Sequence, residues 1–112
     1  MKQPTKIALM QLSSTERLDE NYEQIKAYLH EALAKGAKFI LTPEVSNFIS
    51  NDEKLRWTVL NVESKDPILR LVKDFAFENK IWILIGSLVI KIDETIKNKY
   101  INRSFLISPD GK

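Results

Sequence analysis

Apolar residues occur in this chain in two alternating patterns, short continuous runs and stripes at helical spacing. The continuous run at residues 7–12 is typical of a buried strand. Apolar residues at steps of three and four then predict an amphipathic helix at about residues 16–35. The stripe comprises Leu18, Tyr22, Ile25, Leu29, Ala32 and Leu33. A second apolar run at 37–42 completes a βαβ unit, which predicts two parallel strands joined by a right-handed crossover.

The two ends of this helix carry capping signals. Ser13 and Glu16 have the spacing of a capping box, in which each side chain accepts a hydrogen bond from the other residue's free backbone N–H. Gly36 suits the left-handed backbone position that commonly follows a helix. We therefore expect the helix to lie between these two signals.

The middle of the chain is less regular. Residues 45–65 fit neither the helical nor the strand period, so we expect a loop with a short helix there. Asp66 followed by Pro67 is a typical helix start, because aspartate caps the free N–H groups and proline suits the first turn. This second long helix is expected to end at Asn79.

Two further strands are predicted after it. The run at 81–85 predicts a third buried strand, which Gly86 interrupts as a bulge or bend. The chain then continues extended over residues 87–92. After a charged connection at 93–98, a last strand is expected at 100–108.

The second strand stops abruptly at Pro43, and a carboxylate, Glu44, follows at once. Because proline has no N–H to donate, strand pairing should cease there. Glu44 is therefore expected just beyond the carboxyl end of an interior strand, where α/β proteins keep their sites. We consider it a candidate catalytic carboxylate. The plainer interpretation is an exposed loop residue.

Composition narrows the class of protein. The chain has 112 residues, a net charge of +2 and no cysteine, which excludes disulfides and thiolate metal sites. No basic surface for nucleic acid, no metal cluster, no phosphate-binding loop and no apolar run long enough to span a membrane is apparent, so we expect no cofactor. The start of the chain does not resemble a signal peptide, and we expect a cytoplasmic protein.

The chain stops at Pro109-Asp110-Gly111-Lys112, which is typical of a hairpin turn. A turn brings a return strand alongside, and none follows here. We therefore expect residues 1–112 to be one incomplete domain.

In this order, several segments resemble the carbon–nitrogen hydrolase (nitrilase) superfamily. They are Ile7 to Leu12, Asn21, Glu31 to Ala37, Phe39 to Glu44, Ile85 to Ser87 and Asn102 to Lys112. The stretch Pro43 to Phe48 is most similar to the amidase branch that includes omega-amidase and deaminated-glutathione amidase. The resemblance implies an α/β fold, with this chain as the N-terminal part of an α-β-β-α four-layer sandwich.

It also implies a Glu–Lys–Cys triad that cleaves a small-molecule amide, or a nitrile, bearing a carboxylate. Only Glu44 matches a triad position. The lysine and the cysteine of the family's pattern would lie beyond Lys112, which itself belongs to the turn. We therefore expect the chain alone to be inactive, and to form a homo-oligomer or to pair with a missing C-terminal half.

Two interpretations from other classes stay open. One is a non-catalytic remnant or interaction module translated from an interrupted gene. The other is a flavodoxin-like binding module, which would need a phosphate-binding loop after the first strand; residues 13–15 are polar but lack the expected glycines.

Other polar residues have two interpretations each. Asn47 and Phe48 either line a substrate pocket or simply pack. Asn102 and Ser104 either support the site or form the polar face of an alternating strand. Ser13, Ser46 and Ser87 lack the sequence context of a serine nucleophile.

Overall fold

The computed structural model describes residues 6–10 and 14–112. In chain order, its elements are β1 (Ile7–Leu9), α1 (Leu18–Ala34), β2 (Phe39–Thr42), α2 (Glu53–Val59), the 3₁₀ helix η1 (Glu63–Lys65), α3 (Pro67–Asn79), β3 (Trp82–Lys91) and β4 (Tyr100–Ile107). The alternation of strand and helix follows the alternation of apolar runs and stripes in the sequence.

The strands form one sheet in the order β1-β2-β3-β4. β1 pairs with β2 in parallel, as Ile7 opposite Phe39 illustrates, and β2 pairs with β3 in parallel. β4 returns antiparallel to β3 as a hairpin. The predicted βαβ unit, with two parallel neighbours joined by a helix, is confirmed. β2 is an interior strand, so its carboxyl end lies between the neighbouring strands β1 and β3.

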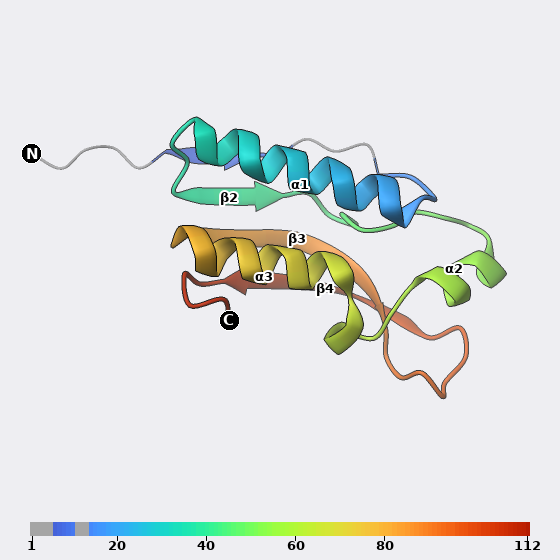
Figure 1. Cartoon of the computed structure of the whole chain (residues 1–112). Coiled ribbons are helices and arrows are strands. Elements are labelled where there is room, and N and C mark those ends of the chain that lie inside the picture. The colour runs from blue at the N-terminus through green and yellow to red at the C-terminus, as the bar shows by residue number, and fades with distance from the viewer. Residues whose placement is uncertain (1–5, 11–13) are drawn as a thin grey trace, which may run out of the picture.

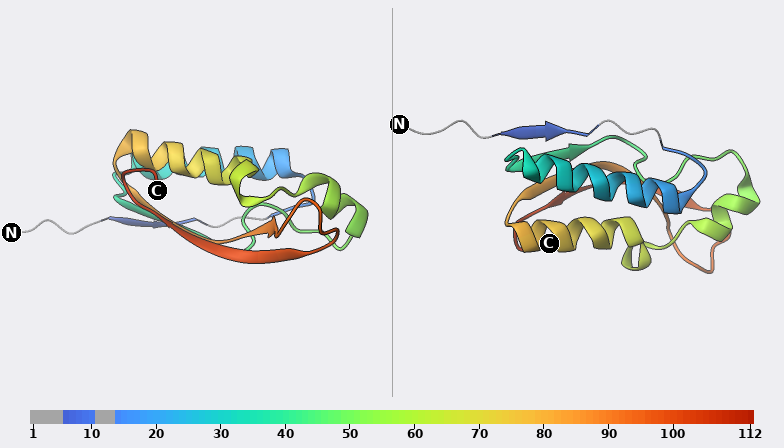
Figure 2. Two further views of the ribbon diagram at one scale, coloured as in Figure 1. Left: turned by 90° about the horizontal axis from the view of Figure 1, so that it is seen from below. Right: turned by 45° about the horizontal axis from the view of Figure 1, so that its top comes forward.

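Helices α1 and α3 lie side by side on one face of the sheet (Figures 1 and 2). The main core lies between this helix layer and the sheet. Its fully buried members include Ile25, Leu29, Ile40, Ile68, Val72, Ile83, Ile85, Leu88, Ile90 and Ile107. Burial of each such side chain stabilises the fold by about 1.5–3 kcal/mol relative to exposure.

The opposite face of the sheet carries no helix among the described residues (Figure 2, left). Because side chains alternate along a strand, the neighbours of core residues point to this open face. Four of them are large and exposed, namely Ile7 (61%), Leu9 (74%), Trp82 (43%) and Leu106 (55%). Over β1 itself, the prediction that the first strand is buried is therefore wrong for one of its faces, and positions 11 and 12 of the predicted strand lie outside the described residues. Its apolar run suits two covered faces, and here only one is covered.

Helix α1 begins later than its capping signal. Leu18 is its first residue, and Arg17 occupies the N-cap, where its side chain makes no capping hydrogen bond. Glu16 precedes the helix, and its carboxylate accepts a hydrogen bond from the Ser50 hydroxyl instead. The predicted capping box is therefore wrong for Glu16, and Ser13 lies outside the described residues. The other end is as expected, with Gly36 in the left-handed region at φ +84°.

Helix α3 begins as the sequence predicts. Asp66 is its N-cap, and its carboxylate accepts a hydrogen bond from the Leu69 N–H at 2.8 Å. Pro67 occupies the first turn, and Lys80 ends the helix in the left-handed region.

The irregular segment between β2 and α3 contains the expected short helix, α2. Trp57 of α2 meets the Tyr100 ring edge-on, with ring centroids 6.2 Å apart. Lys91 lies 4.2 Å over the Trp57 ring, and Arg56 lies 4.4 Å over the Tyr100 ring. These cation–π contacts hold α2 against the end of the β3–β4 hairpin where the two strands are connected.

Candidate active site

Glu44 lies where the sequence predicts, two residues beyond the last residue of β2. Thr42 ends the strand, Pro43 cannot continue the ladder, and Glu44 and Val45 form a turn. The Glu44 side chain is exposed. Within the part of the chain that the structure describes, its carboxylate makes no hydrogen bond or ion pair. The carboxylate is thus accessible to another molecule. A general base needs this accessibility, because it must reach the proton that it removes.

The turn that carries Glu44 rests directly on Gly86 of β3. A Cβ atom at Gly86 would lie 2.6 Å from the Thr42 oxygen, 2.6 Å from the Pro43 carbonyl carbon and 2.8 Å from the Glu44 nitrogen. All three are backbone atoms, so no side-chain rotation can relieve the contact. The pairing register of β3 and β4 shifts between Ile85 and Leu88, which confirms the irregularity expected at this glycine. Only glycine allows the two backbones to approach this closely.

Ser87 holds the same turn through two hydrogen bonds. Its Oγ accepts from the Val45 N–H at 2.7 Å, and its carbonyl accepts from the Ser46 N–H at 3.0 Å. Val45 has a φ of 51°, a left-handed conformation that is unusual for a β-branched residue. Such backbone strain costs about 1–3 kcal/mol and persists only where surrounding contacts impose it. Here the contacts to Ser87 supply that constraint.

Ser46 stabilises the turn through contacts of its hydroxyl group with the residues just before Glu44. Its hydroxyl donates to the Pro43 carbonyl and lies 3.0 Å from the Thr42 hydroxyl. Both Ser46 and Ser87 therefore have structural partners in the turn that carries Glu44.

Asn47 and Phe48 are buried within the protein, with exposed fractions of 0% and 2%. Phe48 packs with Leu60 and Val89 in a small second core. The Asn47 side chain binds Val89 and the Asp66 carboxylate. The packing interpretation therefore describes Phe48, and Asn47 belongs to a buried polar network rather than to an open pocket wall.

The sequence indicated Asp66 only as a helix cap. It is 3% exposed, and its second carboxylate oxygen receives a hydrogen bond from Asn47. Burial raises the pKa of Asp66 above its ordinary value, against the opposing effect of hydrogen bonds from the Leu69 and Ile68 N–H groups and from Asn47. An aspartate cap followed by proline gives no signal of this second contact.

The two polar residues of β4 differ in their contacts. The Ser104 hydroxyl donates to the Gly86 carbonyl at 2.5 Å and so supports the irregular stretch of β3 beneath Glu44. Asn102 is exposed and pairs across the sheet with Val89. Ser104 therefore supports the turn that carries Glu44, whereas Asn102 lies in a stretch of β4 where three consecutive residues are exposed, so an alternation of polar and buried positions is not seen there.

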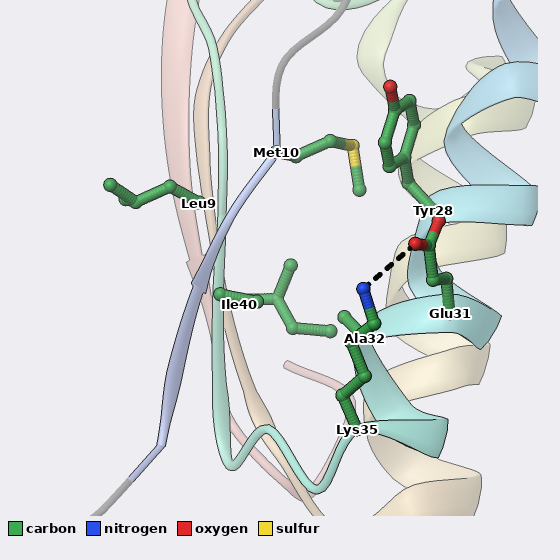
Figure 3. A pocket seen from close by; sticks show the side chains of 8 residues that line it. Leu9, Met10, Tyr28, Glu31, Ala32, Lys35 and Ile40 are labelled. Atoms are coloured by element: carbon green, nitrogen blue, oxygen red, sulfur yellow. Dashed lines mark hydrogen bonds and ion pairs between the residues drawn. The ribbon is translucent and has the colours of Figure 1, made fainter.

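A separate cavity of about 270 Å³ lies between β1 and the C-terminal half of α1 (Figure 3). Met10 and Ile40 point into it from the sheet, whereas Leu9 points away. The Glu31 and Lys35 side chains form an ion pair of 3.1 Å at its rim. Glu44 does not line this cavity, which is therefore distinct from the candidate site.

The described residues contain no group of three or more histidine, aspartate or glutamate side chains arranged to hold a metal ion. Among these residues there is also no helix of the length and apolarity that crossing a membrane requires.

Comparison with known proteins defines the family. Residues 6–112 match the carbon-nitrogen hydrolase family model, and the chain belongs to this family. It is 30% identical over 105 residues to the probable hydrolase nit2 of Schizosaccharomyces pombe and 25% identical over 114 residues to the deaminated glutathione amidase of Dictyostelium discoideum. These matches cover 94% and 99% of the chain but only 37% and 39% of the relatives.

The fold is that of solved members of the nitrilase superfamily. The C. elegans NitFhit protein superposes with a TM-score of 0.81 and 23% identity, over 95% of this chain and 25% of that one. An amidase from Nesterenkonia sp. superposes with a TM-score of 0.71 and 21% identity, over 96% of this chain and 40% of the amidase. The chain spans well under half the length of the relatives that it matches.

Proposed function

We propose that this chain supplies the general base, Glu44, and part of the α/β framework of an amidase-type carbon–nitrogen hydrolase. The cysteine nucleophile and the catalytic lysine would come from further polypeptide. The observation that carries the proposal is the position of Glu44, which lies beyond the carboxyl end of an interior parallel strand on a turn fixed to β3. Its carboxylate is exposed, with no protein partner among the described residues.

The proposed chemistry follows the family's Glu–Lys–Cys triad. Glu44 takes the thiol proton as the cysteine sulfur bonds to the amide carbon, and the lysine stabilises the developing oxyanion. The carbon–nitrogen bond then breaks, the amine leaves with the proton held by Glu44, and a thioester remains. Glu44 next takes a proton from water as the resulting hydroxide attacks the thioester carbon. The carbon–sulfur bond then breaks, the carboxylic acid is released, and Glu44 returns its proton to the cysteine sulfur. General acid–base catalysis of this type contributes roughly 10²–10⁴-fold in rate.

Two relatives support the choice of an amide. One structure of the Nesterenkonia amidase carries the acetamide moiety of fluoroacetamide on its active-site cysteine. The Dictyostelium relative is a deaminated glutathione amidase. We therefore propose a small amide that also bears a carboxylate as the substrate.

By this proposal the 112 residues alone hydrolyse nothing, because they contain no cysteine. A general base without its nucleophile can only activate water. The missing lysine removes a further contribution, since a single oxyanion donor is worth about 10²–10³-fold in rate.

We also propose that the open face of the sheet is covered in the functional protein. Its exposed apolar side chains, Ile7, Leu9, Trp82 and Leu106, form a patch of the kind that marks an interface. The partner is either a C-terminal half that completes the domain or a second copy of the chain.

The test begins with the coding sequence that directly follows the Lys112 codon. The proposal expects a reading frame, in phase or shifted, that encodes a lysine-bearing strand and then a cysteine at a strand end. That polypeptide would be co-expressed with the 112-residue chain. Ammonia release would then be measured from succinamate-like ω-amides, with each part alone as a control.

Activity of the pair, with neither part active alone, is the expected result. Unrelated downstream sequence, or a co-expressed pair without activity, would favour the alternative of a non-catalytic remnant. Turnover by the 112-residue chain alone would contradict the proposed mechanism.

A further inference from the structure

The side-chain amide of Asn47 pairs with the backbone of β3 in the way that the backbone of a neighbouring strand would. The Val89 N–H donates to the Asn47 amide oxygen at 3.0 Å, and the Asn47 amide nitrogen donates to the Val89 carbonyl at 2.8 Å. One side chain thus satisfies both backbone groups of Val89, in a site where Asn47 is 0% exposed. A buried contact of this kind fixes the position of the chain that bears it, because unpaired buried polar groups are costly.

Asp66 orients that side chain from the other direction. Its Oδ2 accepts from the same Asn47 amide nitrogen at 3.3 Å, while its Oδ1 accepts from the Leu69 N–H at 2.8 Å. An asparagine amide group has two N–H donors, and these two acceptors use both. The carboxylate therefore requires the nitrogen, not the oxygen, to face α3, and so sets which way the Asn47 amide is turned.

The backbone of Asn47 is held as well. Its carbonyl accepts a hydrogen bond from the Asn21 side chain at 2.8 Å, and Asn21 of α1 also binds Thr15, which precedes that helix. Asn47 is thus tied to α1, to β3 and to the N-terminus of α3.

These ties bear on Glu44 because the connection is short. Val45 and Ser46 bind Ser87, and Asn47 binds Val89, so the segment after Glu44 is anchored to two nearby positions of β3. The Glu44 carboxylate has no partner of its own among the described residues. The position of Glu44 therefore depends on the backbone of its turn, which includes the anchored residues that follow it.

From this geometry we propose that Asn47 is a positioning residue for Glu44, and that the buried carboxylate of Asp66 orients the Asn47 amide. The inference rests on the proposed role of Glu44 for its consequence in catalysis. Its structural part, the coupling of Asp66 to the Glu44 turn, stands independently of any activity.

The test separates this coupling from the capping of α3. Asp66→Asn keeps an oxygen for the Leu69 N–H, because asparagine and aspartate are equally good N-caps. It turns an NH₂ donor toward the Asn47 donor, however, and so breaks the contact. Asp66→Ser is the second variant, since serine also caps helices but is too short to reach Asn47. Asp52→Asn is the matched control, because Asp52 caps α2 through the Leu55 N–H at 3.1 Å and has no hydrogen bond to residues 44–47.

The readout is amide hydrogen exchange in the 112-residue chain, followed residue by residue by NMR. We expect both Asp66 variants to speed exchange of the Val45 and Ser46 amides roughly tenfold, the factor that corresponds to about 1.4 kcal/mol. Exchange within α3, at Val72 and Ala76, should change by less than about twofold, and Asp52→Asn should leave Val45 and Ser46 unchanged. Unaltered exchange at Val45 and Ser46, or equal acceleration in α3, would overturn the proposal.

In the reconstituted pair, Asp66→Asn should lower kcat at least about tenfold and leave KM within about twofold, as expected when a base is displaced from the reacting atoms. If exchange responds but the wild-type pair is inactive, the proposed function fails and the coupling stands. If the wild-type pair is active but the Asp66 variants change neither the amide exchange of Val45 and Ser46 nor kcat, the proposed coupling of Asp66 to the Glu44 turn fails and the proposed function stands.

Discussion

The Oγ of Ser87 accepts a hydrogen bond from the backbone N–H of Val45 at 2.7 Å, although the two residues are 42 positions apart in the chain. This contact joins the third strand to the turn that bears Glu44. It also compensates for the left-handed backbone of Val45. The position of the candidate base thus depends on β3 as much as on β2, which carries it.

Ser87→Ala removes the acceptor and leaves the Val45 N–H without its partner. We expect the free energy of unfolding to fall by about 1–3 kcal/mol. Urea unfolding at neutral pH measures this. Ser64→Ala, at an exposed serine of η1, is the control and should stay within about 0.5 kcal/mol of the wild type. An equal effect of the two variants would contradict the assigned role of Ser87.

Gly86→Ala places a Cβ against the backbone of residues 42–44 and forces that backbone away from β3. We expect a loss of about 1–3 kcal/mol in stability and large NMR shift changes at the Val45 and Ser46 amides. Gly36→Ala provides the comparison, because Gly36 has φ +84° but no contact closer than 3.7 Å for an added Cβ. It should destabilise through backbone strain alone and leave the Val45 and Ser46 shifts as they are. Unshifted Val45 and Ser46 signals in Gly86→Ala would show that the turn does not rest on Gly86.

Substitutions on the open face of the sheet test whether its exposed apolar side chains cause the chain to associate. Leu9→Ser combined with Leu106→Ser replaces side chains that are 74% and 55% exposed. If this face drives association of the 112-residue chain, sedimentation velocity should show a shift toward smaller species. Phe77→Ser is the matched control, since Phe77 is 53% exposed but lies on α3, in the helix layer. A wild-type chain that sediments as a monomer would contradict the prediction, as would an equal shift in Phe77→Ser.

The raised pKa of Asp66 predicts a particular pH dependence of stability. A buried carboxyl whose pKa is raised holds its proton more tightly in the folded than in the unfolded chain. The contribution of Asp66 to stability is therefore greatest in acid. It falls as the pH rises from about 3.9, the ordinary value, through the raised pKa. The free energy of unfolding of the wild type minus that of Asp66→Asn should decrease over this window and then level off.

The contribution of Asp93 to stability changes with pH in the opposite direction, so Asp93 serves as a control for that measurement. Hydrogen bonds from the Thr95 hydroxyl and N–H lower the pKa of Asp93, so its contribution is lost as the pH falls. Urea unfolding across a pH series would distinguish the two slopes. A difference for Asp66→Asn that rises with pH would contradict the assignment of burial as the dominant cause.

The sequence was sufficient for the βαβ unit and for the location of Glu44, because those features depend on local signals. Periodicity separates strand from helix, and Pro43 ends β2 whatever surrounds it. The exposed face of β1 was not predictable, since an apolar run is the same whether its second face is covered or open. The link between Asn47 and Asp66 crosses 19 positions and depends on the docking of α3. The left-handed backbone at Val45 has no signal either, because no glycine or asparagine marks it.

Replacing the candidate base in the reconstituted pair tests the role of Glu44 most directly. Glu44→Gln keeps the shape of the side chain but cannot accept the proton of the nucleophile, whereas Glu78→Gln changes an exposed glutamate of α3 and serves as the control. We expect ammonia release to fall at least about 10²-fold in Glu44→Gln and to stay close to the wild-type rate in Glu78→Gln. Undiminished turnover by Glu44→Gln would contradict the assignment of Glu44 as the base.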